Sequence, residues 1–311
     1  MSRRIAITGA TGFIGGMLAR RLASSDWQTR ALTRRGSVHK QPAHIATEWI
    51  TGDLGDMESL RRLVGGADAV VHCAGVVRGA NQAHFNRVNV DGVARMVRAA
   101  AEQHPAPRFL LISSLAAREP HLSFYAASKR QGEEMLALNS GEMPWAVLRP
   151  PAVYGPGDRE LLPIFQWMAR GIAPVIGSGK GRFSLLYVED LADAIIQWLE
   201  LGNRHSCAFE LHDGHIGGYS WHDIVDTMAR LKGATILRAR IPVLFVKLLA
   251  RVNLMAAKVL GSTPMLTPGK VRELIHPNWV CDNAEFNNHT GWTPRIYLED
   301  GLRRTLEKPD V

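Results

Sequence analysis

Tyr125 and Lys129 are the residues of this sequence best suited to proton transfer. The segment Tyr-Ala-Ala-Ser-Lys opens a predicted helix, in which a spacing of four residues places the phenol and the ammonium on one face. A neighbouring ammonium stabilises a phenolate, so we expect Lys129 to lower the pKa of the Tyr125 phenol toward working pH. Such a phenol can give a proton to a carbonyl oxygen or take one from an alcohol. The pair by itself is a common coincidence, so its meaning depends on its surroundings.

A glycine-rich segment near the start of the chain predicts a nucleotide-phosphate site. Residues 8–15 read TGATGFIG and lie between a β-branched run and a stretch with helical periodicity. In that setting Gly9 allows a tight turn, Gly12 lets the backbone approach a pyrophosphate, and Gly15 lets helix and strand pack closely. The N-terminus of the helix adds positive potential for phosphates. We therefore expect a bound dinucleotide, with an unliganded glycine turn as the alternative.

Two arginines indicate which dinucleotide this is. The second expected strand ends in Arg34 and Arg35, about twenty residues past Gly15, where an NAD enzyme usually has an acidic residue for the ribose hydroxyls. Guanidinium groups there suit a 2′-phosphate, because they are planar and permanently charged. NADP(H) is therefore favoured; NAD(H) with a merely solvated arginine pair is the alternative.

The pattern of apolar residues predicts the elements that position these groups. Short β-branched runs alternate with amphipathic helical stretches, as a parallel sheet covered by helices requires. The expected strands are 4–8, 28–33, 68–73, 108–113 and 145–149. We expect an α/β fold with a Rossmann-type doubly wound parallel sheet in a dinucleotide-binding domain, residues 1–151 with a return segment near 183–202. Residues 152–182 and 203–311 are expected to form a smaller mixed α/β substrate-binding lobe.

Ser113 and Ser114 end the fourth expected strand, at the carboxyl edge where open α/β sheets bind their ligands. Either hydroxyl could polarise the reacting oxygen. His72, at the end of the third expected strand, is interpreted as a core or strand-end residue without a chemical role. Asp190 is expected to support the return to the sheet or to cap a helix.

Taken together, these segments resemble the short-chain dehydrogenase/reductase superfamily, in particular its extended branch of NAD-dependent epimerase/dehydratase-like proteins. The resemblance covers nearly the whole chain and includes GDL at 52–54, HCAG at 72–75, NVDG at 89–92, RPPAVYGP at 149–156 and YVED at 187–190. LTPGKVR at 266–272 and GWTP at 291–294 are closest in pattern to 3β-hydroxysteroid dehydrogenase-like members. Bacterial reductases of ceramide or 3-ketosphinganine are one candidate group within that range.

The resemblance implies roles for named residues. It assigns catalysis to Ser114, Tyr125 and Lys129, with Ser113 in reserve, because Ser114 directly precedes the Leu-Ala-Ala run; its spacing of eleven residues to Tyr125 is shorter than usual in the extended branch. No metal site is expected. The implied cofactor-binding residues are Gly9, Thr11, Gly12, Phe13, Ile14, Gly15, Arg34, Arg35, Asp53, Leu54, Cys73, Ala74, Gly75, Asn89, Ser113, Lys129, Pro150 and Val153.

The net charge of +8 is concentrated in one stretch, because residues 227–272 contain no Asp or Glu and nine Lys or Arg. Within it, residues 242–260 predict a helix opened by a proline, with Lys247, Arg251 and Lys258 in a narrow stripe and the rest of the circumference largely apolar. Such a helix suits an anionic membrane surface. The alternative is a buried helix with a solvated basic edge. Nucleic acid is not expected, since no aromatic platform accompanies the charge.

The cysteines, the position of the first expected strand and the lengths of the apolar stretches indicate the cellular location. Cys73, Cys207 and Cys281 are far apart, as expected for reduced structural thiols. The first expected strand begins at Arg4, which leaves no room for a targeting peptide, and no apolar window is long enough to span a bilayer. We expect a cytoplasmic protein, with peripheral contact at the inner face of the membrane as an option. The resemblance also allows a homodimer.

Three functions are consistent with these features. The first is an NADP(H)-dependent oxidoreductase that reduces a keto group, or oxidises the alcohol, on a hydrophobic, lipid-like substrate such as a 3-keto sphingolipid or ceramide precursor. The second is a sugar-nucleotide epimerase or dehydratase with bound NAD, which Arg34 and Arg35 disfavour. The third is a non-catalytic NADPH-binding accessory protein, which an intact Tyr125 and Lys129 disfavour.

Overall fold

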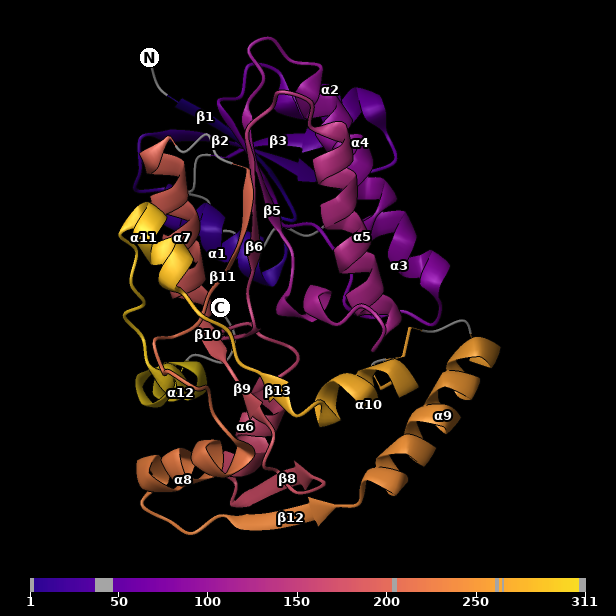
Figure 1. Cartoon of the computed structure of the whole chain (residues 1–311), viewed down its shortest axis with the longest axis vertical. Helices are drawn as coiled ribbons and strands as arrows, with labels where there is room; N and C mark the ends of the chain where they lie inside the picture. Colours follow the sequence, from indigo (N-terminus) through magenta and orange to yellow (C-terminus); the bar gives the residue numbers. More distant parts are fainter. Residues whose placement is uncertain (1–2, 37–46, 203–205, 261–262, 265, 308–311) are drawn as a thin grey trace.

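The computed structural model of the chain describes residues 3–36, 47–202, 206–260, 263–264 and 266–307, with the side chains of 258–260 left aside. Its centre is a seven-stranded sheet in the order β11-β6-β5-β4-β1-β2-β3 (Figure 1), and every neighbouring pair in it is parallel. The expected doubly wound sheet is therefore confirmed. Its strands are β1 (Arg3–Thr8), β2 (Trp27–Thr33), β3 (Thr47–Thr51), β4 (Ala69–His72), β5 (Arg108–Ile112), β6 (Trp145–Arg149) and β11 (Cys207–Glu210).

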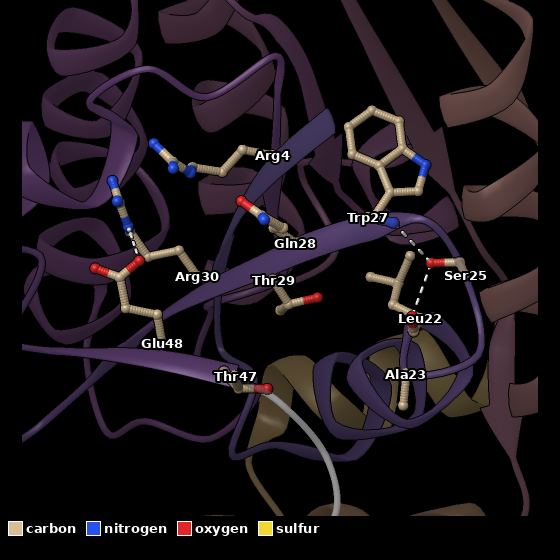
Figure 2. Close-up of a pocket in the computed structure, with 10 residues that line it drawn as sticks. All are labelled: Arg4, Leu22, Ala23, Ser25, Trp27, Gln28, Thr29, Arg30, Thr47 and Glu48. Atoms are coloured by element: carbon tan, nitrogen blue, oxygen red, sulfur yellow. Dashed lines mark hydrogen bonds and ion pairs between the residues drawn. The ribbon is translucent and has the colours of Figure 1, made fainter. Parts of the chain in front are cut away.

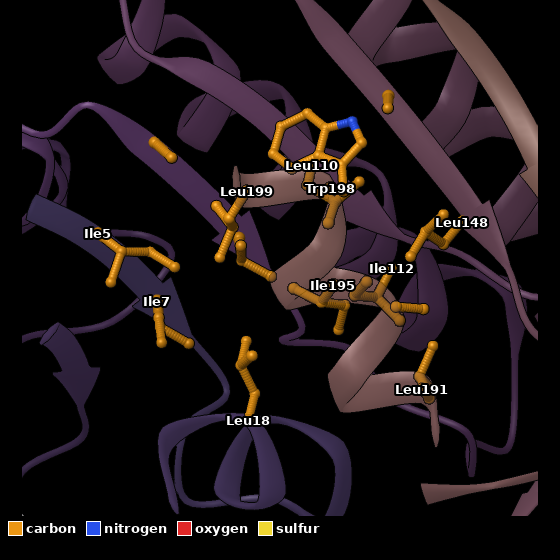
Figure 3. Close-up of a cluster of buried hydrophobic side chains, with 14 of the residues drawn as sticks. Ile5, Ile7, Leu18, Leu110, Ile112, Leu148, Leu191, Ile195, Trp198 and Leu199 are labelled. Atoms are coloured by element: carbon orange, nitrogen blue, oxygen red, sulfur yellow. The ribbon is translucent and has the colours of Figure 1, made fainter. Parts of the chain in front are cut away.

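Helices cover both faces of this sheet, because successive side chains of a strand point to opposite faces. Ile5 and Ile7 of β1 pack toward one layer while Ala6 between them packs toward the other. The first layer contains α1 (Phe13–Leu22), α7 (Val188–Leu201) and α11 (Ala284–Thr290), and Figure 3 shows α7 side chains such as Trp198 over the strands. The second contains α2 (Met57–Val64), α3 (Gln82–Asn89), α4 (Asp91–Ala101) and α5 (Phe124–Asn139).

A smaller lobe lies beyond the carboxyl ends of the strands (Figure 1), around a core that includes Tyr154, Phe165 and Met228. Its helices are α6 (Leu162–Ala169), α8 (Trp221–Lys232), α9 (Val243–Leu260), α10 (Pro268–Ile275) and α12 (Leu298–Glu307). Its strands pair in parallel twos: β7 (Ala152–Tyr154) with β10 (Leu185–Tyr187), β8 (Ile172–Ile176) with β12 (Leu237–Ile241), and β9 (Arg182–Phe183) with β13 (Asn278–Trp279).

Two segments depart from the expected division of the chain. β11 belongs to the range 203–311 that was expected in the smaller lobe, but it pairs with β6 and completes the large sheet. The reason is packing, because Phe209 is fully buried against Phe286 in the core of the first helix layer. Within the expected return segment, α7 packs on α1, whereas β10 pairs with β7 and not with the large sheet.

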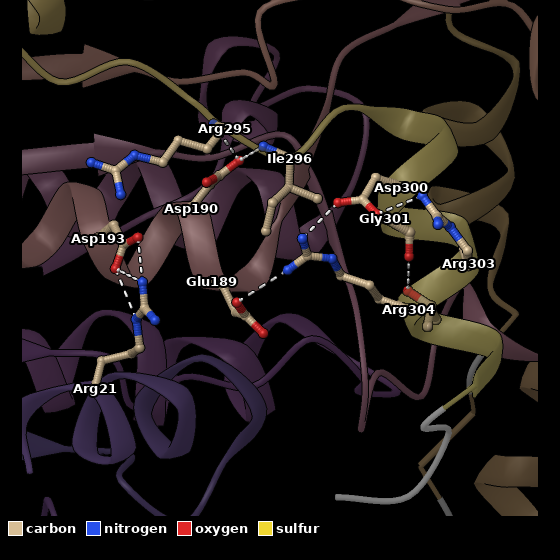
Figure 4. A network of polar contacts seen from close by, with 11 residues as sticks. Arg21, Glu189, Asp190, Asp193, Arg295, Ile296, Asp300, Gly301, Arg303 and Arg304 are labelled. Carbon is tan, nitrogen blue, oxygen red and sulfur yellow. Dashed lines mark hydrogen bonds and ion pairs between the residues drawn. The ribbon is translucent and has the colours of Figure 1, made fainter.

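Asp190 holds the C-terminal segment against α7 (Figure 4). Its carboxylate accepts hydrogen bonds from the backbone N–H groups of Arg295, at 3.1 Å, and Ile296, at 2.8 Å. Glu189 faces Arg304 of α12 at 3.8 Å, and Arg304 also pairs with Asp300. Asp190 therefore has a supporting role, but the partners of its carboxylate belong to the C-terminal segment, whereas the sequence predicted support for the return to the sheet or a helix cap.

Among the helices that the structure describes, none combines the length and the apolar character that a membrane-spanning segment needs.

Candidate active site

The turn between β1 and α1 is built so that two positions accept only glycine. Gly9 has a φ of +75°, and a Cβ there would lie 2.7 Å from the backbone nitrogen of Ala74. A Cβ on Gly15 would lie 2.3 Å from the carbonyl oxygen of Gly9. The turn is closed by a hydrogen bond of 2.9 Å from the Gly12 N–H to that same oxygen. These contacts bring the turn, the first helix and the end of β4 together as a phosphate-binding turn requires.

The N-terminus of α1 is open toward a ligand. Thr11 and Gly12 are exposed, and no side chain caps the helix, so backbone N–H groups of its first turn remain available to an anion. The side chains of Phe13 and Ile14 are partly buried and pack against the core. These two residues can therefore offer a cofactor their backbone groups, and the turn fits a dinucleotide pyrophosphate.

The segment after β4 forms the opposite wall, at the point between β1 and β4 where the strand order reverses. The N–H of Cys73 donates to the Thr8 carbonyl and that of Ala74 to the Thr8 hydroxyl, both at 3.2 Å. Further along the chain, the side-chain amide of Asn89 accepts from the Val76 N–H at 2.9 Å and donates to the Val76 carbonyl at 3.0 Å. It also donates to the Ser128 hydroxyl. Open α/β sheets bind ligands at this reversal point. Asn89 shapes the wall beside Gly75 and ties it to α5.

His72 belongs to the structure of this edge, as the sequence predicted. Its ring is fully buried, stacks on Phe109, and has Nδ1 2.9 Å from the hydroxyl of Thr8. Burial, together with the nearby Lys129 charge, lowers the pKa of His72 to about 3. The imidazole is therefore neutral at any working pH.

The residues expected at the adenosine end emerge side by side. Thr33 and Thr51 are partners in the pairing of β2 and β3, and the Gly52 N–H donates to the Thr33 carbonyl at 2.9 Å. Arg34 and Asp53 follow directly, and both are exposed. In the described part of the chain the guanidinium groups of Arg34 and Arg35 form no ion pair. Leu54 packs beside α4, where a Cβ on Gly92 would lie 2.9 Å from it.

The two candidate serines have different partners in the structure. The hydroxyl of Ser114 lies near enough to the Tyr125 phenol to lower the phenol pKa, and it also caps the short 3-10 helix η1 (Leu115–Arg118), accepting from the Ala116 N–H at 3.2 Å. The hydroxyl of Ser113 instead donates to the buried carboxylate of Glu133. Only Ser114 is therefore placed to act on an oxygen that Tyr125 also reaches.

Burial sets the protonation of the tyrosine and the lysine. It raises the pKa of Tyr125 to about 12 against the opposing effect of the Ser114 hydroxyl, and it lowers the pKa of Lys129 to about 8 against the opposing charge of Glu133. The Lys129 ammonium donates to the Ile112 carbonyl at 2.9 Å. The expectation that Lys129 brings the phenol pKa down is thus wrong for this structure, because loss of hydration raises that pKa, the charges of Glu273 and Glu160 raise it further, and Lys129 is not among its causes. The phenol stays protonated, as a proton donor should.

Glu133 is a site residue that the sequence analysis missed. It lies one helical turn after Lys129 on α5 and accepts a hydrogen bond from Ser113, just past the end of β5. It also forms an ion pair with Arg149 at the end of β6, in which the Arg149 Nε donates at 3.0 Å. It therefore ties α5 to the ends of two strands. The periodicity of Tyr125, Lys129 and Glu133, each four residues apart, was the available signal.

Pro150 and Val153 continue from β6 toward the smaller lobe. The Pro150 carbonyl accepts from the Leu115 N–H at 2.9 Å, which fixes η1 behind Ser114. Val153 is partly buried and packs with Phe13 of the glycine-rich turn. The segment thus connects the region of Ser114 with the glycine-rich turn.

A pocket of about 230 Å³ opens beside Tyr125. Its walls come from the segment after β4, the start of α5, and helices α9 and α10. Two ion pairs border it, Arg78 with Glu160 at 2.7 Å and Lys270 with Glu273 at 3.1 Å. The apolar residues on its walls are Val77, Ala80, Phe85, Phe124, Leu254, Pro264 and Pro268. A substrate oxygen at Tyr125 would thus have both apolar surface and the charged side chains of Arg78, Lys270, Arg272 and Glu273 around it.

A second pocket, of about 430 Å³, lies at the amino ends of β1, β2 and β3, away from these residues (Figure 2). Arg30 in its wall already pairs with Glu48 at 2.9 Å and donates to backbone carbonyls, including that of Gly65. None of the expected site residues lines it. In the described part of the chain no cluster of His, Cys, Asp and Glu could hold a metal ion.

Comparison with known proteins agrees with this geometry. The model of the NAD dependent epimerase/dehydratase family matches residues 5–207, so the chain belongs to that family. It is an NAD(P)-dependent oxidoreductase of the extended short-chain dehydrogenase/reductase branch. The ceramide reductase of Caulobacter vibrioides is 40% identical over 310 residues, which cover 97% of this chain and 93% of that protein.

Two further likenesses are more distant. The 3beta-hydroxysteroid-dehydrogenase/decarboxylase isoform 2 of Arabidopsis thaliana is 26% identical over 84% of this chain and 51% of its own length, in line with the pattern near the C-terminus. The crystal structure of UDP-glucuronic acid 4-epimerase from Bacillus cereus with UDP-glucuronic acid and NAD has a TM-score of 0.75 at 18% identity, over 98% of both chains. This last likeness shows the fold alone.

Proposed function

We propose that the protein is an NADP(H)-dependent reductase of a keto group on an acyl lipid of the ceramide-precursor type. The observation that carries this proposal is the pocket that Tyr125 lines together with seven apolar residues, although charged residues of α10 also line it. The 40% identity to a ceramide reductase supports the lipid class, and the exposed pair of Arg34 and Arg35 supports the 2′-phosphate. A cytoplasmic location with peripheral membrane contact is part of the same proposal.

The site residues divide the chemistry as follows. When bound, the reduced dinucleotide supplies a hydride to the carbonyl carbon of the substrate. The Tyr125 phenol gives its proton to the carbonyl oxygen, and the Ser114 hydroxyl donates a hydrogen bond to that oxygen as negative charge develops on it. The Lys129 ammonium stabilises the phenolate that remains until solvent returns the proton. With a pKa of about 12, the Tyr125 phenol holds its proton at neutral pH, which is the form that ketone reduction needs.

The experiment that tests the activity is a screen of NADPH oxidation with long-chain 3-keto lipids presented in detergent, beside UDP-sugars. We expect turnover of at least one keto lipid and none of the sugar nucleotides, because apolar residues line much of the pocket. Interconversion of a UDP-sugar without net cofactor oxidation would instead support the epimerase alternative. Binding of NADPH without turnover of any ketone would support the accessory-protein alternative.

Glu133 gives a prediction about pH. With a Lys129 pKa of about 8, reductase activity is expected to fall as the pH rises through about 8, since the ammonium is then lost. Glu133→Gln removes the carboxylate that raises this pKa, so the alkaline limb of the kcat profile should move to lower pH. The measurement is kcat against pH with saturating substrates.

Two variants control for a purely structural effect of Glu133. Glu133→Asp keeps the charge and should restore the limb toward its wild-type position. Glu134→Gln alters the exposed neighbour, which pairs with Arg130, and should leave the limb unchanged. A uniform loss of kcat at every pH, with the limb unmoved, would show that Glu133 holds α5 without acting on Lys129.

A further inference from the structure

One face of α9 exposes an unusual number of large apolar side chains to solvent. Leu244 is 80% exposed and Met255 is 70% exposed. Exposed single apolar residues are ordinary on a protein surface, but a contiguous set indicates a partner. The exposed apolar residues of this face are Leu244, Phe245, Leu248, Leu249, Val252 and Met255.

The opposite face of α9 is packed. Val246 and Ala250 are buried with Val271 of α10, and partly buried residues such as Ile241 complete the contact. The helix is therefore fixed to the lobe by one side while the other stays open, at the margin of the molecule in Figure 1. A buried helix with a solvated basic edge, the alternative for this segment, is wrong for these residues, because apolar side chains are exposed as well as basic ones.

The charged residues of α9 whose side chains are described are both positive. At about 100° per residue, Lys247 and Arg251 form a strip that borders the apolar arc, which itself spans roughly 140° from Leu244 to Leu249. Both basic side chains are exposed, as is Arg240 at the end of β12, and none of the three has an ion pair in the described part of the chain. An apolar arc with a basic border fits the interface of an anionic bilayer, with the cations at the headgroups.

The same helix forms a wall of the pocket at Tyr125. Leu254 lines that pocket together with Pro268 and Gly269 of α10. Gly269 lies against Ser123, the residue that caps α5 just before Tyr125, and Arg272 donates to the Leu122 carbonyl at 2.7 Å. One helix thickness, about 10 Å, thus separates the exposed apolar face from the pocket.

We propose that α9 lies in the interface of an anionic membrane and that the pocket at Tyr125 receives its substrate from that membrane. The second half of this inference rests on the proposed function, since it needs a lipid substrate. The first half depends only on the apolar face and its basic border. A substrate with long acyl chains then has about one helix thickness to cross between the membrane and Tyr125.

Flotation with vesicles tests the membrane contact. The purified full chain should float with phosphatidylcholine vesicles that contain phosphatidylglycerol. Leu244→Asp combined with Leu248→Asp should lower the vesicle-bound fraction at least about tenfold, because it places charge in the apolar arc. Lys247→Gln combined with Arg251→Gln should weaken binding about fivefold per charge on the anionic vesicles, with little change on phosphatidylcholine alone.

The matched control is Leu138→Asp combined with Ile216→Asp, two residues that are 75% and 91% exposed outside α9. It should float like the wild type. All variants should keep the wild-type thermal midpoint, since only exposed side chains change. Equal flotation of the α9 variants, or no flotation of the wild type at low salt, would overturn the proposal; loss of a dimer in the Leu244→Asp, Leu248→Asp variant would assign the face to a second copy instead.

Kinetics separate this inference from the proposed function. The α9 double variant Leu244→Asp, Leu248→Asp should retain turnover of a short-chain, water-soluble ketone. It should lose at least about tenfold in kcat/KM for a long-chain ketone embedded in vesicles. Equal loss on both substrates would contradict delivery from the membrane. If the wild type reduces no ketone even in detergent, the proposed function fails while the flotation result still stands.

Discussion

Tyr125→Phe is expected to lower kcat for ketone reduction by about 10²–10⁴-fold while leaving the affinity for NADPH within about twofold of wild type. The phenol is the proton donor of the site, and burial keeps it protonated, with a pKa of about 12. Phe preserves the ring and its contact with Phe85 but has no proton to give. The measurement combines steady-state NADPH oxidation with a fluorescence titration of cofactor binding.

Two further variants make this result specific. Tyr297→Phe removes the hydroxyl of a tyrosine that is 57% exposed in the smaller lobe, and it should leave kcat unchanged. Ser114→Ala, which removes the hydroxyl near the phenol, should cause a smaller loss than Tyr125→Phe. Turnover by Tyr125→Phe within tenfold of wild type would remove Tyr125 as the donor and leave the pocket without an evident acid.

Much of the sheet could be predicted from the sequence, because its strands are buried on both faces and read as β-branched runs. All five expected strands are present, and the glycine-rich turn lies where the pattern of strand and helix placed it. β3 and β11 were missed. β3 lies at the edge of the sheet with a mostly half-exposed, polar sequence, and β11 has only four residues, so neither has a clear periodic signal.

Within the site, the spacing of residues in the sequence indicated which side chains share a helix face, but not how deeply each side chain is buried. It placed Tyr125 and Lys129 on one face of a helix, yet the pKa of each group depends on burial by distant segments, which spacing does not contain. The choice between Ser113 and Ser114 likewise depends on Glu133, which reaches one serine and not the other. For α9, periodicity gave the basic stripe, but only its packing on α10 decided which apolar side chains are covered.

The second large effect concerns the cofactor. Arg34→Ser combined with Arg35→Ser is expected to weaken NADPH binding by about 10²-fold while changing NADH binding little, so that the preference for NADPH is lost. A charge-assisted hydrogen bond contributes about 1.5–3 kcal/mol, which is about 10–150-fold in affinity. Both guanidinium groups are exposed beside Asp53 at the carboxyl edge of β2 and β3, where the adenosine ribose of a bound dinucleotide is expected. Fluorescence titration with each dinucleotide measures the effect.

Arg98→Ser provides the control for charge alone, because Arg98 is an exposed arginine on α4, outside the expected cofactor site. It should leave both affinities unchanged. The double variant should also bind NADPH with a shallower salt dependence than the wild type, since fewer charges meet the 2′-phosphate. Wild-type affinities that are equal for NADPH and NADH, or a parallel loss of both in the double variant, would contradict the 2′-phosphate site. In that case the arginines act only as a positive surface, and the site accepts either dinucleotide through the glycine-rich turn.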